Sequence, residues 1–395
     1  MNKFELNWVA LIVVFALLTT AIVGLEMATM GDNSIVATKL AEKGEGATPS
    51  EGNVPVPSHG SLFFVLVFWT GVVQGCIALV AVADLLKAKW VDPVRRYMLS
   101  VYPILLLIPF LFLIFFLFES RALPWVIGGP DPAMAATAEH GPSVHGWFSE
   151  KRFMISNLVL LLAVFIVGQK FAKESARITE KRSFWALQYI LIYVLCQSMV
   201  AFDWVMPLDY PWPSTMFGGF FFLEGGYAAL AIAGIVGLMI YRKSKEEFQK
   251  GAAGFRDLGG LRLAFSLGWG WFFFSQYLVI WYGNLPEEVE WFTFRAHGEH
   301  ADLLYPLLCV IVAFILFVPF IAQLPERSKS DPRIFSAISV LMLLTLLLER
   351  FVMIAPRVAL NPMVLLMEFA IMGVVFLLAM GSRERILDRP YAVSE

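Results

Sequence analysis

Residues 97–118 read YMLSVYPILLLIPFLFLIFFLF, without a single charged side chain. A helix that crosses the hydrocarbon core of a bilayer needs about 20 consecutive, predominantly apolar residues. Similar stretches lie on both sides of this one, and each is bounded by charged residues, proline or glycine. Such a pattern predicts a series of membrane-spanning helices.

The composition excludes several classes of protein. Of the 395 residues, 58% are apolar and 16% charged, against roughly 25% charged in soluble domains, and the mean hydropathy is +0.70. A soluble globular protein is therefore excluded. The alternating segments of about 10 residues that form outer-membrane barrels are absent from the sequence. The net charge of -2 gives no basic footprint for nucleic acid.

These stretches predict an all-α polytopic membrane protein with about ten transmembrane helices in one integral membrane domain, residues 1–395. The first stretch could be a signal peptide, but its apolar core is long and no clear cleavage site follows, so we expect a retained helix. The expected helices are residues 7–29, 61–86, 97–118, 153–172, 183–205, 214–241, 258–282, 301–325, 334–355 and 362–382.

The distribution of basic residues predicts the orientation. Of the 30 Lys and Arg residues, 21 fall on one set of predicted helix ends and loops, and 7 on the opposite set. Basic residues are enriched in cytoplasmic loops of membrane proteins. We therefore expect both termini, with an even number of helices between them, to be cytoplasmic. The long connections 30–60, 119–152 and 283–300 then lie on the outer side.

Neither the histidines nor the cysteines predict a cofactor. All five histidines (His59, His140, His145, His297 and His300) fall in the outer connections, and a b-type haem inside a helical protein needs histidines within the helices. The three cysteines (Cys76, Cys196 and Cys309) form no CxxC or CxxCH motif. We expect no covalently bound cofactor and no metal site.

Ionisable residues inside the predicted helices are candidates for function, because each costs about 2.5–3.5 kcal/mol on insertion scales. Glu224 lies about ten residues into its helix, or roughly 15 Å, and therefore near the membrane midplane. The other ionisable residues lie nearer the outer side: Glu26, Asp203, Glu349, Arg350 and Glu368. Gln276 and Tyr277 lie at a similar depth in their helix.

Two interpretations of these residues are open. They can line a polar cavity or proton relay that opens outward, or Arg350 can pair with one carboxylate while the rest hold helices together. Asp84 and Arg262 lie near predicted helix ends on the basic side, where a long side chain can reach the interface. For these two we expect only structural roles.

Two segments are unusual for membrane helices. Residues 202–217 read FDWVMPLDYPWPSTMF, with Asp203 and Asp209 on either side of a proline-broken outer turn. Residues 272–291 read FFFSQYLVIWYGNLPEEVEW, so that a helix ends in a polar, acidic segment. Together they resemble the NrfD-like integral membrane subunits of alternative complex III, a bacterial quinol oxidoreductase. Within that family the ActF-like subunits are the nearer match, and the ActC-like paralogues the second.

The resemblance implies two four-helix bundles, formed by the second to fifth and sixth to ninth helices, with the first and last helices beside them. It implies a multi-pass protein of the bacterial cytoplasmic membrane. Its partners would be an NrfD-like paralogous subunit, an iron-sulfur protein, c-type haem subunits and membrane lipids, with quinol or menaquinol bound at or near this subunit. The matching positions are Asp203 and Asp209 in the first motif, and Gln276, Tyr277, Glu287 and Glu288 in the second.

The leading hypothesis is a subunit of a respiratory quinol:cytochrome c oxidoreductase that has no redox cofactor of its own. It would support quinol oxidation by releasing or conducting protons. The nearer alternative is a direct quinol-binding subunit of the same complex. A secondary transporter with intramembrane carboxylates is a second class, and a subunit that only anchors its partners is a third.

Overall fold

The computed structural model describes residues 60–120, 123, 147, 149–209, 212–298 and 301–387. In these residues the chain forms helices and no strands. The elements, in chain order, are α2 (Ser61–Leu85), α3 (Arg95–Leu99), α4 (Ile104–Phe118), α8 (Glu150–Ala176), α9 (Arg182–Val200), η2 (Ala201–Val205), η3 (Met206–Asp209), α10 (Phe217–Lys243), α11 (Lys245–Lys250), α12 (Ala252–Gly283), α13 (Pro286–His297), α14 (Ala301–Val312), η4 (Ala313–Phe317), α15 (Val318–Gln323), α16 (Glu326–Ser330), α17 (Pro332–Ile354), α18 (Pro362–Gly381) and α19 (Arg383–Ile386).

The described residues form nine helical segments that are long and apolar enough to cross a membrane. They match nine of the ten predicted spans, so a multi-pass helical membrane protein is confirmed. The predicted helix 7–29, which contains Glu26, lies outside the described residues, as do residues 30–59 of the first outer connection and most of 119–152. Only His297 of the five histidines is described.

Two boundaries differ from the prediction. The span 97–118 is interrupted at residues 100–103, because Pro103 precedes α4 and its ring cannot continue a helix from α3. α12 begins at Ala252, six residues before the predicted start. Arg262 is therefore well inside a helix, and the expectation that it lies near a helix end is wrong.

The outer connection 283–300, for which no helix is predicted, contains the helix α13. The sequence does carry helix signals there. Pro286 occupies the first turn, and Arg295 and His297 occupy the last. Proline is favoured at the start of a helix, and cations are favoured at its end.

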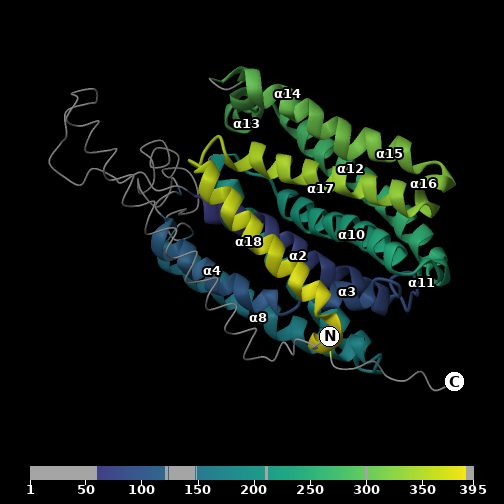
Figure 1. Ribbon diagram of the computed structural model, residues 1–395. Helices are drawn as coiled ribbons and strands as arrows, with labels where there is room; N and C mark the ends of the chain where they lie inside the picture. Colours follow the sequence, from purple (N-terminus) through teal and green to yellow (C-terminus); the bar gives the residue numbers. More distant parts are fainter. Residues whose placement is uncertain are drawn as a thin grey trace.

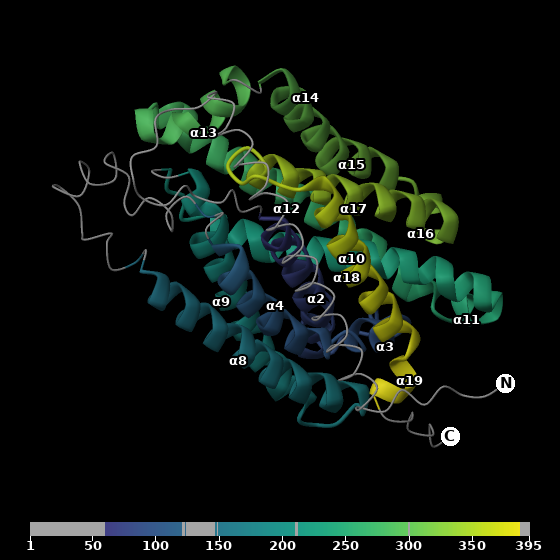
Figure 2. The ribbon, with the colours of Figure 1, turned by 60° about the vertical axis from the view of Figure 1, so that its left-hand side comes forward.

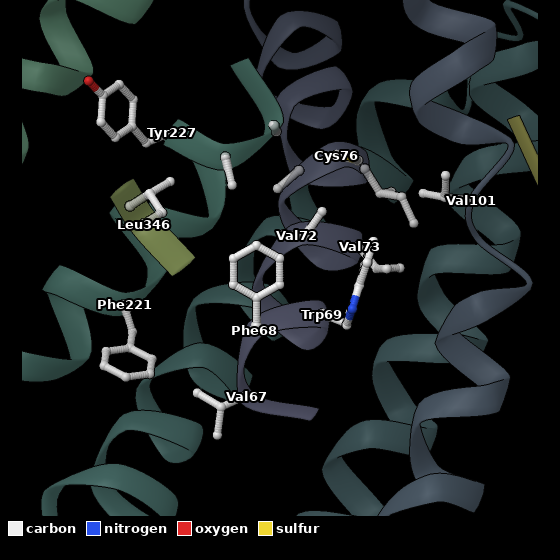
Figure 3. Packing of buried hydrophobic residues seen from close by; sticks show 14 of the residues in the cluster. Val67, Phe68, Trp69, Val72, Val73, Cys76, Val101, Phe221, Tyr227 and Leu346 are labelled. Carbon is white, nitrogen blue, oxygen red and sulfur yellow. The ribbon is translucent and has the colours of Figure 1, made fainter. Parts of the chain in front are cut away.

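Helices α2 and α10 lie in the middle of the molecule (Figures 1 and 2). α2 also packs against α9, α4 and α18, and α10 packs against α17, α12 and α9. Phe68 and Val72 of α2, Phe221 of α10 and Leu346 of α17 belong to one buried core cluster (Figure 3). A helix in this position must be apolar all round, and α2 is buried over most of its length.

The contact between α2 and α10 depends on glycine. A Cβ added at Gly75 would lie only 1.9 Å from the carbonyl oxygen of Gly225. Small residues allow helix backbones to approach closely in membranes, where packing replaces the hydrophobic effect between helices. Any side chain at Gly75 would therefore push α2 and α10 apart.

Aromatic side chains of α12 fit against two other glycines of α10. Added Cβ atoms at Gly219 and Gly226 would lie 2.8 and 2.6 Å from the rings of Phe272 and Phe265, respectively. The two glycines and the two phenylalanines are each seven residues apart, or about two helical turns. This packing brings the middle of α12 against the middle of α10.

The turns that carry most of the basic residues lie at one end of the described helices, which we call the basic end. It includes residues 86–94 and 177–181, α11 and α16, and α3, α11 and α16 can be seen together in Figure 1. The other end, which includes η3 and α13, is called the opposite end below.

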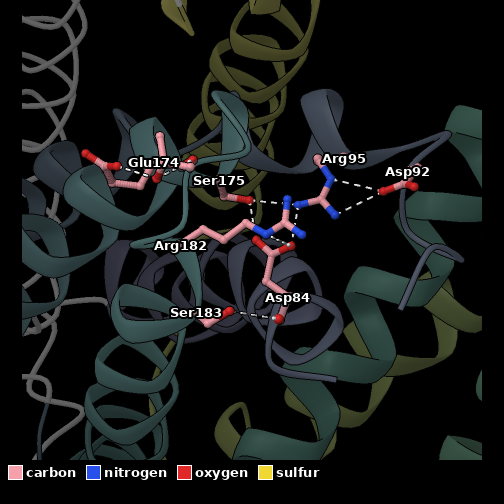
Figure 4. Close-up of polar contacts among 8 residues, drawn as sticks. Asp84, Asp92, Arg95, Glu174, Ser175, Arg182 and Ser183 are labelled. Carbon is pink, nitrogen blue, oxygen red and sulfur yellow. Dashed lines mark hydrogen bonds and ion pairs between the residues drawn. The ribbon is translucent and has the colours of Figure 1, made fainter. Parts of the chain in front are cut away.

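A network of ion pairs and hydrogen bonds joins four helices, α2, α3, α8 and α9, at the basic end (Figure 4). Asp84 of α2 accepts hydrogen bonds from Arg95 at 2.6 Å and Ser175 at 2.5 Å, and Arg182 lies 3.8 Å away. Arg95 also pairs with Asp92 at 3.0 Å. Asp84 is fully paired in this network, which agrees with the structural role expected of it.

Candidate functional site

A group of four side chains lies in the interior between α10, α12 and α17. Arg350 of α17 forms an ion pair with Glu224 of α10. The indole Nε1–H of Trp269, on α12, lies 3.2 Å from Oε1 of Glu224 and 3.1 Å from Oε1 of Glu349. We call these four residues the glutamate group. Three of its members, Glu224, Glu349 and Arg350, are predicted site residues, and the fourth, Trp269, is not.

The four side chains of the glutamate group are buried. Exposed fractions are 2% for Glu224, 3% for Glu349 and 7% for Arg350, and Trp269 is fully buried. The Arg350 guanidinium also lies 3.9 Å from the centre of the Phe221 ring. Charged groups at such depth are stable only when they are paired or neutralised.

The charges of the glutamate group do not balance when both carboxyl groups are ionised. One guanidinium faces two carboxyl groups, and the ion pair uses Glu224. Oε2 of Glu349 is buried and accepts no hydrogen bond within the part of the chain that the structure describes. A proton on Glu349 would make the group neutral and would give this oxygen a donor hydrogen.

A narrow aromatic cleft extends from Glu349 toward the opposite end. Its volume is about 40 Å³, which is room for about three or four water molecules at roughly 10–15 Å³ each. The lining is almost wholly apolar and comes from α10, α12, α13, α14 and α17. It comprises Trp212, Phe217, Phe220, Trp269, Phe273, Gln276, Ile280, Trp291, Phe292, Leu308, Ile311, Glu349, Val352 and Met353.

A wider pocket lies beside the cleft. Its volume is about 240 Å³, and it shares Trp212, Gln276 and Ile280 with the cleft and reaches Glu288. The indole N–H of Trp212 is buried without an acceptor among the described residues. Glu349 thus lies at the inner end of the cleft and Glu288 in the pocket, and the residues between them are mostly aromatic.

The second motif contributes the residues between the cleft and the surface. Gln276 lines both cavities, and its Oε1 accepts a hydrogen bond from Ser214 at 2.9 Å. Tyr277 is 40% exposed on α12 and contacts Phe292 edge-on. Glu288 is half-buried at the pocket. Glu287 lies in the first turn of α13, and its side chain lies outside the described residues.

Asp209 forms a separate ion-pair site at the opposite end. It accepts hydrogen bonds from Arg295 at 2.7 Å and from Arg357 at 2.8 Å. Arg295 is fully buried, lies 4.0 Å from the Trp291 ring and donates to the backbone carbonyl of Val352. Burial lowers the pKa of the Arg295 guanidinium, and the charge of Asp209 opposes that change. This site ties η3 and α13 to the end of α17, beside the cleft.

Asp203 lies in another group, between η2 and α8. Arg152 donates two hydrogen bonds to its two oxygens, at 3.0 and 3.1 Å, and Asn157 donates a third at 3.0 Å. Asn157 in turn accepts the indole hydrogen of Trp204 at 2.8 Å. The described contacts give Asp203 no link to the glutamate group, and a role for it in proton transfer stays a prediction.

Glu368 also lies apart from the glutamate group. It is fully buried on α18, which packs against α2. Within the described residues, no group of three or more His, Cys, Asp or Glu side chains has the arrangement of a metal site. Cys76 and Cys196 are buried and Cys309 is exposed, and all three are free thiols.

Proline shapes two of the helices beside the site. The π-helical segments η2 and η4 each end two residues before a proline, Pro207 and Pro319. A proline has no N–H for the carbonyl four residues earlier, which is Ile315 in the case of Pro319. That carbonyl instead accepts a hydrogen bond from Tyr227 of α10 at 2.9 Å. The broken helix is thereby held against α10, one turn from Glu224.

Reasoning from the sequence missed Trp269, Arg295, Arg152 and Asn157. Trp269 had a usable signal, because it falls on one face of α12 with Arg262, Ser266 and Gln276 at spacings of four, three and seven residues. Arg295 and Arg152 were counted only as loop charges, and nothing in their local sequence indicates distant carboxylate partners.

Comparison with models of known protein families finds no match to this chain, and comparison with curated proteins finds none either. The resemblance to NrfD-like membrane subunits therefore depends on the two quoted motifs and the helix plan, and it stays a prediction.

Proposed function

We propose that this chain is an integral membrane subunit of a bacterial quinol:electron-acceptor oxidoreductase, in which it accepts protons from quinol oxidation and releases them at the outer side. It has no redox cofactor of its own. In this proposal the basic end is cytoplasmic, as are both termini, and ten helices form two four-helix bundles with two further helices beside them. An NrfD-like paralogue, an iron-sulfur protein and c-type haem subunits supply the redox chemistry.

One observation carries the proposal: the free oxygen of Glu349 is buried at the inner end of a cleft that extends to the opposite end. Oxidation of a quinol liberates protons, which need an acceptor. A carboxyl group in a dry site whose charge is not balanced can take and release a proton with little rearrangement. The positive-inside rule places the opposite end outside the cytoplasm.

The other members of the glutamate group have definite parts in this scheme. Arg350 forms the ion pair with Glu224 and fixes its position. Trp269 donates toward both glutamates, so that it fixes their relative positions and couples their protonation. Glu349 exchanges the proton. Water in the cleft and the amide of Gln276 then lead to Glu288 and the surface.

The size of the cleft favours proton transfer over direct quinol binding. Sites for small organic ligands measure about 300–1,000 Å³, whereas the cleft measures about 40 Å³ and the pocket beside it about 240 Å³. A quinol ring would have to displace Phe273, Phe292 or Trp291. The same comparison disfavours a transporter site for an organic substrate beside the glutamate group.

Two experiments test the proposal in sequence. The first is purification in mild detergent, with mass spectrometry of the co-purifying chains and assays for haem and quinone. The proposal expects multihaem and iron-sulfur subunits, and a chain that purifies alone without quinone would contradict it and favour a transporter.

The second experiment measures quinol oxidation and proton release in the assembled complex with Glu349→Gln. We expect a loss of at least about tenfold, because positioned acid–base groups contribute roughly 10²–10⁴-fold. The matched control is Glu326→Gln, an exposed glutamate at the basic end, which should leave both rates unchanged. An assembled Glu349→Gln complex with normal turnover and proton yield would refute the role of Glu349.

A further inference from the structure

Arg262 is fully buried, and no described carboxylate forms an ion pair with it. Its Nε donates to Gln323 at 2.6 Å, and its Nη1 donates to the carbonyl of Phe335 at 2.9 Å and to Ser339. The Phe335 ring lies 4.0 Å from the guanidinium carbon. Its Nη2 makes no hydrogen bond within the described part of the chain. Every one of these neighbours is electrically neutral.

The other buried arginines of the described residues are different. Arg95 pairs with Asp84, Arg295 with Asp209, and Arg350 with Glu224. In each pair a carboxylate within 3.0 Å or less cancels the positive charge locally. Arg262 alone among these four keeps a charge that no described carboxylate within ion-pair distance compensates.

Arg262 lies between the glutamate group and the basic end. It is seven residues before Trp269 on the same face of α12, which is about 10 Å along the helix axis. Ser266 lies between them on this face, and its hydroxyl donates a hydrogen bond to the carbonyl of Leu263 at 2.8 Å. Ser266 and the guanidinium of Arg262 are thus polar groups of α12 on the side of the glutamate group that faces the basic end.

We propose that Arg262 is an electrostatic barrier that prevents protons from passing between the glutamate group and the basic end. A fixed guanidinium in a buried, poorly hydrated interior repels protons and other cations, as positive groups do in selective membrane pores. The inference rests on the proposed function and deepens it. Glu349 then exchanges protons with the opposite end only, and protons released there do not return across the membrane.

Passive proton leak tests the barrier without any quinol chemistry. The full-length chain, with the subunits that co-purify with it, is reconstituted into liposomes that contain a pH-sensitive dye, and a proton gradient is imposed with potassium and valinomycin. We expect Arg262→Met to raise the leak on the order of tenfold over the wild type, the effect of removing a unit charge about 10 Å away at an effective dielectric constant near 20.

Two variants separate charge from packing. Arg262→Lys keeps the charge, and Gln323→Leu keeps Arg262 but removes the acceptor of its Nε–H. The proposal expects the proton leak of both variants to equal that of the wild type. A leak in all three variants would show that packing, not charge, seals the path, and a tight Arg262→Met variant that is folded by gel filtration would overturn the barrier.

The double variant Arg262→Met with Glu349→Gln tests the connection to the glutamate group. The proposal expects the leak of the single variant to be lost, because its path includes Glu349. An unchanged leak would show that Arg262 does not guard this group. Since the leak assay contains no quinol, its outcome is independent of the turnover test of the proposed function.

Discussion

Replacing Arg350 with methionine would leave the glutamate group with two carboxyl groups and no cation. The side chain is 8% exposed, and its partner Glu224 is 2% exposed. Methionine is apolar and unbranched, so it can occupy much of the same space against the Phe221 ring. The substitution therefore removes charge with little loss of volume.

The expected cost is about 3–5 kcal/mol in the free energy of unfolding. Removing one partner of a buried ion pair costs this much, because the remaining charge is left without compensation. The lost contact with the Phe221 ring contributes to that figure, at up to about 2 kcal/mol for a desolvated pair. Adding Glu224→Gln should recover about 2–3 kcal/mol, because the neutral amide needs no cation and can still accept from Trp269.

Equilibrium unfolding in mixed detergent micelles, followed by circular dichroism, measures both variants against the wild type. Arg350→Lys is the control that keeps the charge and should cost less than Arg350→Met. A cost below about 1 kcal/mol for Arg350→Met would refute the reasoning. So would a double variant that is less stable than the single one, since the two losses would then be independent.

Three further substitutions test separate parts of the structure. Gly75→Ala should destabilise the protein by about 1–3 kcal/mol in the same unfolding assay, because the new methyl group would meet the backbone of α10; Gly381→Ala, which has open space, is the control, and equal effects would contradict the close contact. Trp269→Phe keeps a ring against its neighbours but removes the indole donor, and should cost about 1–3 kcal/mol; no cost would mean that neither glutamate needs that hydrogen bond. Asp203→Asn should lower stability by about 1.5–3 kcal/mol through the loss of charge-assisted bonds from Arg152. Unchanged stability would contradict this reasoning, and lowered turnover of the assembled complex would support the predicted role of Asp203 in proton transfer.

Much of the fold could be predicted from the sequence, because the requirement for about 20 apolar residues per span is a local one. The predicted helix boundaries were less accurate, because of a proline in one span and an early helix start in another. The break between α3 and α4 at Pro103 and the early start of α12 changed where residues lie in depth. The start of α12 changed the interpretation of Arg262 from a residue near a helix end to one in the interior.

The site was predicted in part. Depth in a helix identified Glu224, Glu349 and Arg350 as unusual, and the structure brings these three together. Depth alone could not separate Asp203, whose partner Arg152 is 51 residues away in sequence. Partners of this kind depend on how helices pack, which a single sequence does not specify.

The most direct test of the account is to observe the proton on Glu349 itself. Infrared difference spectroscopy of the reconstituted protein detects the carbonyl stretch of protonated carboxyl groups as the pH is changed on one side of the membrane. The account predicts a band that disappears in Glu349→Gln and responds only to the pH at the opposite end. A band that persists in Glu349→Gln, or one that follows the pH at the basic end, would contradict it.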